Sequence, residues 1–451
     1  MVVAKKLLII KQNLYIIFVY NMWKGMYIMG LIQKYNIANN INLYVIKDKK
    51  YKTVLASTYI HRSLSRQEAT LNSLLTKVLK LSTAKYPTPL KLNIYAEKLY
   101  GCGFDVSVSK RASVQSIVSQ VSFLSDKYAG EGILEESMSL MLDMLFDPYV
   151  DNGAFNAEYV ENQKKNLKDD IDSLINDKRA YASVRCLEEM CKGEENAIVE
   201  IGYKEDIDDI TEKSLYEHYK SVIFSSPIDI FVVGDVEAEK LQEFLIKYFN
   251  NYCFNITPIN IVCNPKTATE QKYVEDNLNV NQGKLSIGLR TGINIDNPMY
   301  YALLTGNSIF GSGAHSKLFN NVREKLSLCY YAYSRLDKYN GLMLVGSGIE
   351  FDKFSMTKDA ILTELDAVKN GDFTDDELDI AKEYIISSFS AFSDSPGLLI
   401  DYYLGMAFSN NYPEISQMCD KVKSVTREDI CKAFSLVSVD TVYFLNGKEN
   451  N

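Results

Sequence analysis

An internal repeat limits the folds open to this chain of 451 residues more than any single motif does. Phe155 and Lys164 match Phe373 and Lys382 at an offset of 218 positions. A second set matches at an offset of 215: Ile207, Ile210, Thr211, Leu215 and Tyr219 correspond to Val422, Val425, Thr426, Ile430 and Phe434. Two units of similar length and element order therefore follow one another along the chain.

The length of the chain exceeds one ordinary hydrophobic core, so two domains of roughly 200 residues each are expected. We place an N-terminal domain at residues 30–254 and a C-terminal domain at residues 272–451. The linker is residues 255–271, where Pro258 and Pro265 lie among largely polar residues. Strands mix with helices without regular alternation, which predicts an α+β fold with mixed, mainly antiparallel sheets and helices on one face.

Hydrophobic periodicity predicts the elements of the N-terminal domain. We expect a hairpin of strands 41–46 and 53–60, a helix over 66–81, a helix over 92–100, strands within 106–123, and a helix over 134–146. A long amphipathic helix begins near residue 155 and is expected to turn Val160, Leu167, Ile171 and Leu174 inward.

In the C-terminal domain, a helix after Pro298 is broken by Gly311 and Gly313. A second helix follows and carries an apolar face made of Leu318, Phe319, Val322 and Leu326. Alternating residues predict strands at 329–334 and 342–349, joined by a tight turn at Asn340-Gly341.

Charge and cysteine content restrict the partners and the compartment. The net charge is −9 and the pI about 5.2, which argues against nucleic acid as a partner, because phosphate binding requires a basic surface. The 8 cysteines are scattered without a C-x-x-C pair, as is typical of reduced thiols in a cytoplasmic protein.

Residues 1–29 are expected to be an N-terminal extension or an added edge element. The apolar run 14–20 has the length of a signal-peptide core, which leaves that alternative open, but no small-x-small cleavage site follows it. The run is too short to span a bilayer, so no membrane partner is expected.

Residues 310–350 resemble the C-terminal half of the pitrilysin-like or insulinase-like peptidases, in the two-domain form that includes the mitochondrial processing peptidase subunits. That family has a glycine-rich loop, a Ser-x-Leu-Phe helix, an Arg-Glu-Lys run and then a Tyr, in this order. Here these features are Gly311 and Gly313, Ser316 with Leu318 and Phe319, Arg323-Glu324-Lys325, and Tyr330. The resemblance implies two homologous α+β domains that face each other like a clamshell.

Active members of that family carry H-x-x-E-H on the first long helix of the N-terminal domain, where the two His bind zinc and the Glu activates water. The aligned positions here hold Ser73, Thr76 and Lys77, and Asp170 occupies the position of the third ligand. A serine, a threonine and an ammonium cannot replace the two imidazoles and the base. We therefore predict a degenerate site with no catalytic zinc and no other cofactor.

Two further hypotheses follow from the resemblance. Lys77 and Asp170 are expected to form an ion pair where the metal would have been, unless both are simply solvated helix residues. Arg323 and Tyr330 match the pair that contacts the substrate carbonyl in active relatives, so they are possible substrate-binding residues. The alternative is that Arg323 pairs locally on its helix and Tyr330 packs in a sheet.

The resemblance implies a catalytically inactive, cytoplasmic subunit that pairs with a zinc-bearing homologue, or forms a homodimer, and binds an extended polypeptide by edge-strand addition. Within the family the chain is most similar to the YfmF-like bacterial branch, which lacks the zinc motif and is associated with modification of elongation factor P. Two alternatives remain open: an active zinc metallopeptidase with an unrecognised site, and a purely structural subunit.

Overall fold

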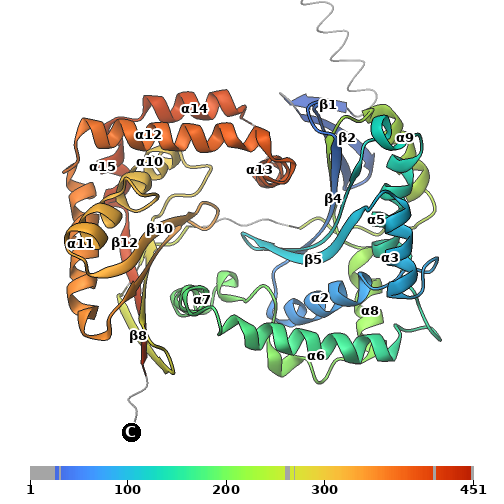
Figure 1. Cartoon of the computed structure of the whole chain (residues 1–451), viewed down its shortest axis with the longest axis horizontal. Coiled ribbons are helices and arrows are strands. Elements are labelled where there is room, and N and C mark those ends of the chain that lie inside the picture. Colours follow the sequence, from blue (N-terminus) through green and yellow to red (C-terminus); the bar gives the residue numbers. More distant parts are fainter. Residues whose placement is uncertain (1–25, 30–31, 260–264, 269, 410–412, 448–451) are drawn as a thin grey trace, which may run out of the picture.

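The computed structural model describes residues 26–29, 32–259, 265–268, 270–409 and 413–447. It contains two α+β halves, each built on its own sheet, which face each other across a central space (Figure 1). The predicted fold class is therefore confirmed. Of the predicted extension, Met26–Met29 form an edge strand beside Ile32–Ala38, and residues 1–25 lie outside the described part of the chain. The domain boundaries stay a prediction.

The first sheet has the order β1-β2-β3-β7-β4-β6-β5. Its strands are β1 (Met26–Met29), β2 (Ile32–Ala38), β3 (Ile41–Lys47), β4 (Thr53–Ser63), β5 (Gly103–Arg111), β6 (Val114–Leu124) and β7 (Ile228–Gly234). The second sheet has the order β10-β11-β9-β12-β8. Its strands are β8 (Lys272–Leu278), β9 (Gly283–Arg290), β10 (Cys329–Asp337), β11 (Leu342–Ile349) and β12 (Ser438–Gly447).

The predicted hairpin of strands 41–46 and 53–60 is wrong. Strand β7 lies between β3 and β4, parallel to β3 and antiparallel to β4. Every residue of β7 is buried, as expected for a central strand covered on both faces. The apolar, β-branched sequence of β3 and β4 indicates that both are strands, but it does not show that another strand lies between them.

The described helices of the first half include the four predicted ones, at ranges close to those expected, and four that the sequence did not predict. They are α2 (Arg66–Leu79), α3 (Pro89–Lys98), α4 (Asp126–Ala129), α5 (Ile133–Phe146), α6 (Ala157–Leu174), α7 (Lys178–Met190), α8 (Glu212–Ile223) and α9 (Ala238–Phe249). On α6, Val160 and Leu167 are buried and Ile171 packs against the core, as predicted. Leu174 is 38% exposed, so its predicted inward position is wrong: at the last turn the helix passes beyond the core and reaches a cavity.

The helices of the second half are α10 (Tyr300–Phe310), α11 (Phe354–Asn370), α12 (Asp375–Ser390), α13 (Pro396–Ser409), α14 (Ile415–Ser424) and α15 (Arg427–Ser435). Between α10 and β10, Leu318–Lys325 form a π-helix, η3. Leu318 and Val322 are buried, but Leu326 is exposed, contrary to the predicted apolar face. The wider π-helical turn, closed by the bond from the Leu326 N–H to the Asn321 carbonyl, carries Leu326 away from that face.

Equivalent contacts in the two halves confirm the internal repeat. The Lys164 ammonium donates to the carbonyl of Asp208 at 3.2 Å, and the Lys382 ammonium donates to that of Lys423 at 3.1 Å. Thr211 and Thr426 both begin a helix, α8 and α15, with a capping box. The residues that repeat in the sequence therefore form the same helix caps and the same lysine-to-backbone hydrogen bonds in both halves.

Each half also contributes one helix to the other half. Helix α7 packs on β9 and β12 of the second sheet, where Ala182 and Cys186 contact Tyr443 and Leu445. Helix α13 packs on β7 of the first sheet (Figure 1). In the described residues no helix combines the length and hydropathy needed to cross a membrane, and the described cysteines are free thiols.

Candidate functional site

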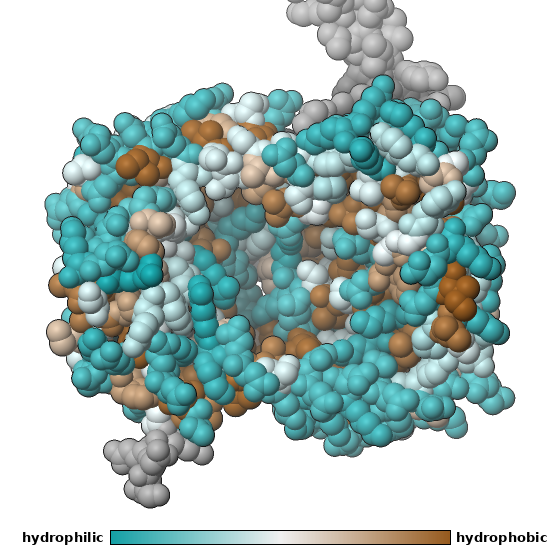
Figure 2. Space-filling view, viewed as in Figure 1, coloured by the Kyte–Doolittle hydropathy of each residue, from teal (hydrophilic) through white to brown (hydrophobic). Residues whose placement is uncertain are grey.

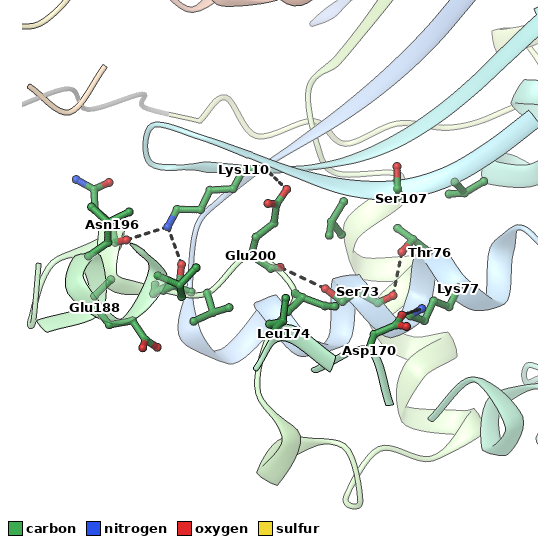
Figure 3. Close-up of a pocket in the computed structure, with 18 of the residues that line it drawn as sticks. Ser73, Thr76, Lys77, Ser107, Lys110, Asp170, Leu174, Glu188, Asn196 and Glu200 are labelled. Atoms are coloured by element: carbon green, nitrogen blue, oxygen red, sulfur yellow. Dashed lines mark hydrogen bonds and ion pairs between the residues drawn. The ribbon is translucent and has the colours of Figure 1, made fainter. Parts of the chain in front are cut away.

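A cavity of about 530 Å³ lies at the predicted degenerate metal site (Figure 3). Helix α2 supplies Ser73, Thr76 and Lys77, and the end of α6 supplies Asp170. Strand β5, helix α7 and residues 196–201 complete the walls. The structure thus brings together the four positions that the sequence singled out.

Ser73 and Thr76 are buried, and both hydroxyls have partners within the protein. Helix α2 is fixed at its start by Ser65, whose side chain accepts the Glu68 N–H. The Ser73 hydroxyl donates to the Glu200 carbonyl at 3.3 Å, and that of Thr76 donates to the Ser73 carbonyl at 2.9 Å. Neither hydroxyl points freely into the cavity as a metal ligand would.

The predicted ion pair between the Lys77 ammonium and the Asp170 carboxylate is confirmed. The Lys77 side chain is 18% exposed and that of Asp170 is 50% exposed. Because water screens such a pair, its net contribution to stability is small, about 1 kcal/mol or less. The pair places a positive charge from α2 beside the carboxylate of α6, so that carboxylate is already neutralised.

Residues 195–201, which we call the 195–201 segment, cross one end of the cavity and are bound to Lys110 of β5 (Figure 3). The Lys110 ammonium donates to the carbonyls of Asn196 at 2.8 Å and Ile198 at 2.7 Å. Its backbone N–H donates to the Glu200 carboxylate at 2.7 Å. Burial lowers the pKa of Lys110 and raises the pKa of Glu200, since both charges are removed from water.

A chain of hydrogen bonds that the sequence reasoning missed runs behind the cavity. The His218 ring contacts the side-chain oxygen Oδ1 of Asn72 at 2.8 Å, and the side-chain amide of Asn72 donates to the Gln115 side-chain oxygen at 2.8 Å. Gln115 in turn donates to the Glu200 carbonyl at 2.8 Å. Burial lowers the pKa of His218 to about 4, so the ring is neutral at pH 7. The partners are far apart in sequence, so no local pattern predicts this network.

The other two histidines are likewise occupied away from the cavity. His61 contacts Ser116 at 2.8 Å and Asp229 at 3.2 Å on the opposite face of the first sheet, under α13. His315 contacts Ser308 at 3.0 Å in the second half. Within the described residues, no cluster of three or more His, Cys, Asp or Glu side chains has the geometry to hold a metal ion. The residues at the degenerate site therefore do not fit the zinc that active relatives bind.

Strand β5 is one of the two edge strands of the first sheet, and its residues Val106 and Val108 line the cavity. Its neighbour on one side is β6, paired in antiparallel register. The bond from the Lys110 N–H to Glu200 shows that the backbone of Lys110 faces away from β6. Because backbone groups alternate in an antiparallel ladder, those of Val106 and Val108 face the same outer side.

Arg323 and Tyr330 line one hollow together, but not the cavity that contains Lys77 and Asp170. The Arg323 guanidinium lies 4.6 Å from the centre of the Phe319 ring and 3.5 Å from the Glu324 carboxylate. Tyr330 is 59% exposed, and its hydroxyl lies 3.5 Å from Glu350. Both side chains are thus accessible, and within this chain they are separate from the degenerate site.

Comparison with known proteins gives consistent matches along the chain. A family model described as "Peptidase M16 inactive domain" matches residues 209–385. The Bacillus subtilis protein named "Probable inactive metalloprotease YmfF" is 34% identical over 412 residues, which cover 91% of this chain and 96% of that protein. The B. subtilis "Uncharacterized zinc protease YmxG" is 22% identical and covers 57% of this chain and 62% of its own length.

Solved structures show the same fold. A conserved protein from Enterococcus faecalis V583 superposes with a TM-score of 0.87 at 26% identity, covering 94% of this chain and all of that one. A peptidase M16 inactive domain from Pseudomonas fluorescens superposes with a TM-score of 0.76 at 18% identity over 92% of this chain and 98% of its own. Together with the occupied hydroxyls and the Lys77–Asp170 pair, these matches show that the chain belongs to the M16 peptidase family, as a non-catalytic member.

Proposed function

We propose that this protein is a non-catalytic subunit that pairs with a zinc-bearing M16 homologue and holds an extended polypeptide along β5. The observation that carries this proposal is the position of β5, an edge strand that lines the cavity at the degenerate site. An exposed edge offers N–H and C=O groups in register, and an extended peptide adds to it as a further strand.

The cavity suits such an added strand. Side chains of an extended peptide alternate between two faces, so every second one would point from the β5 edge toward the walls formed by α2, α6 and α7. Those walls include Leu174, Val184 and Leu187, beside the neutralised Lys77–Asp170 pair. The cavity thus favours polypeptide with aliphatic residues at alternate positions, and it does not require a particular sequence.

The separation of Arg323 and Tyr330 from the degenerate site supports pairing with a second chain. They line another hollow, and neither residue lines the cavity that contains Lys77 and Asp170. Exposed as they are, they remain available to a substrate in a partner's site, either in a zinc-bearing homologue or in a second copy of this chain. Resemblance to the YfmF-like branch supports a cytoplasmic role connected with modification of elongation factor P.

Peptide binding by the isolated protein tests the proposal. A Val108→Pro variant removes the outer N–H of β5 and leaves the ladder to β6 intact, so it should abolish binding of a fluorescent aliphatic peptide measured by anisotropy. The matched control is Ser109→Ala, which keeps every backbone donor and should bind like the parent protein. Equal binding by the parent and Val108→Pro would refute edge-strand capture, and no binding by the parent would favour a purely structural subunit.

Pairing is tested by purification from the native host with identification of the associated chain. Loss of activity of the complex on Arg323→Ala, with assembly intact, would support action in the partner's site. Unchanged activity would remove that role. Metal analysis of the purified chain addresses the remaining alternative, because stoichiometric zinc would indicate an active metallopeptidase with an unrecognised site.

A further inference from the structure

A second cavity, of about 580 Å³, lies between the two halves. The end of β5 contributes Lys110 and Arg111, the end of β10 and the turn after it contribute Arg335 and Lys338, and α13 contributes Asp401. The molecule is hollowed at this central position, and the hollow is lined largely by hydrophilic residues (Figure 2). Four cationic side chains, from the ends of β5 and β10 and from the turn after β10, therefore converge on one inter-half cavity.

Two of these cations already have partners. Arg111 forms an ion pair with Asp401 and donates to the Tyr339 hydroxyl at 3.0 Å, which ties the first half to the second. Lys110 is bound to the 195–201 segment. The carboxylate of Asp337 is likewise occupied, because it accepts the backbone N–H groups of Tyr339 and Asn340.

Lys338 and Arg335 are the cations that remain. Among the described residues, Lys338 has no ion-pair or hydrogen-bond partner for its ammonium, and its nearest compensation is the Tyr339 ring, 5.2 Å away. Burial and the neighbouring Arg111 lower the pKa of Lys338 to about 8, against the opposite effect of Asp401 and Asp337. In the described part of the chain, the more distant Asp401 and Asp337 and the Tyr339 ring compensate this ammonium only partly, because none of them makes an ion pair or hydrogen bond with it.

We propose that Lys338 and Arg335 bind a carboxylate of the polypeptide held on β5. This inference rests on the proposed function, because the two cavities are adjacent: Lys110, Leu187 and Glu200 line both. A peptide that leaves the β5 edge beside Lys110, where the 195–201 segment takes over the outer backbone N–H, lies next to the second cavity. An ammonium and a guanidinium are the side chains that give charge-assisted hydrogen bonds to a carboxylate.

The carboxylate has two sources, the C-terminus of the peptide or an Asp or Glu side chain. Three synthetic peptides of about ten alternating aliphatic and polar residues distinguish them: one with a free C-terminus, one amidated, and one amidated with Asp as its last residue. Binding is measured by anisotropy at pH 7. The free acid should bind about tenfold tighter than the amide. If the amidated peptide that ends in Asp binds as tightly as the free acid, an acidic side chain can also supply the carboxylate.

Variants locate the effect. Lys338→Met should reduce the preference for the free acid to less than about threefold, while thermal unfolding shows a stability equal to or above that of the parent. Lys240→Met, an exposed lysine on α9, is the control and should leave the preference unchanged. Equal affinity of acid and amide, or a preference that survives Lys338→Met, would overturn this inference alone. Absence of binding by all three peptides would overturn it together with the proposed function.

Discussion

Removal of Arg290 is expected to destabilise the protein strongly, because this side chain joins the two halves from a buried position. Arg290 is 4% exposed on β9 and donates to Asp440 of β12 at 2.9 Å. It also donates to Glu194, which follows α7, at 2.7 Å, and to the Met190 carbonyl at 2.9 Å. Breaking a buried pair by removing one partner costs about 3–5 kcal/mol, because a charge is left in the interior without compensation.

The substitution Arg290→Met keeps most of the volume and leaves two carboxylates without their cation. Lys266, 3.5 Å from Glu194, partly compensates that residue, so the expected loss lies near 3 kcal/mol. Adding Asp440→Asn should recover about 1–2 kcal/mol, since an amide replaces the unpaired charge.

Urea unfolding followed by circular dichroism measures both changes in the free energy of unfolding. The control is Lys240→Met, whose ion pair with Glu237 is exposed on both sides and should change stability by less than about 0.5 kcal/mol. A loss below about 1 kcal/mol for Arg290→Met would refute the reasoning that this network fixes α7 to the second sheet.

Three further predictions concern the first half and are measured by the same unfolding assay. The pKa of His218 is lowered to about 4, so between about pH 6.5 and pH 4 the unfolded chain binds a proton that the folded protein does not. The free energy of unfolding should therefore fall as the pH drops through this range, by about 2 kcal/mol at pH 5. His218→Gln should remove most of that loss, and the same pH profile in this variant would contradict the assignment. Gly202 has a φ of +87°, and a Cβ at this position would lie 2.5 Å from helix α2, so Gly202→Ala should lower the free energy of unfolding by about 2–4 kcal/mol. The control is Gly101→Ala, where φ is +72° but the space is open, and there the loss should be about 1 kcal/mol. Lys77→Ala should cost less than about 1 kcal/mol because Asp170 is half exposed; a larger loss would show that the pair is a structural element.

Local sequence patterns were sufficient for α2, α3, α5, α6 and α10, and for the repeat. The α2 helix could be predicted from its apolar stripe, and its pairing with α6 from the alignment that placed Asp170 opposite Lys77. Strand neighbours could not be predicted in this way, because β7 enters between β3 and β4 from a position more than a hundred residues later. The π-helix at Leu318–Lys325 also escaped prediction, since its apolar spacing is close to that of an α-helix.

The polar contacts of the candidate site depend on long-range packing. The Asn72 side chain meets His218 and Gln115 only after α8 and β6 have packed on α2. Likewise, the binding of Glu200 to Lys110 and the isolation of Lys338 arise where two halves meet. Amphipathic periodicity reports which face of an element is buried, but it does not report which polar groups meet there, so these contacts required the structure.

Loss of hydrolysis and retention of polypeptide binding are physically independent in this fold. A zinc site depends on side chains of α2 and α6, and substitutions to Ser73, Thr76 and Lys77 remove it completely. Edge-strand addition depends on backbone groups of β5, which no side-chain substitution on α2 alters. The Lys77–Asp170 pair also neutralises the carboxylate that α6 retains at a site without a metal. A chain of this family can therefore stop hydrolysing peptides and still present an ordered strand to them, which is the combination that the proposed function requires.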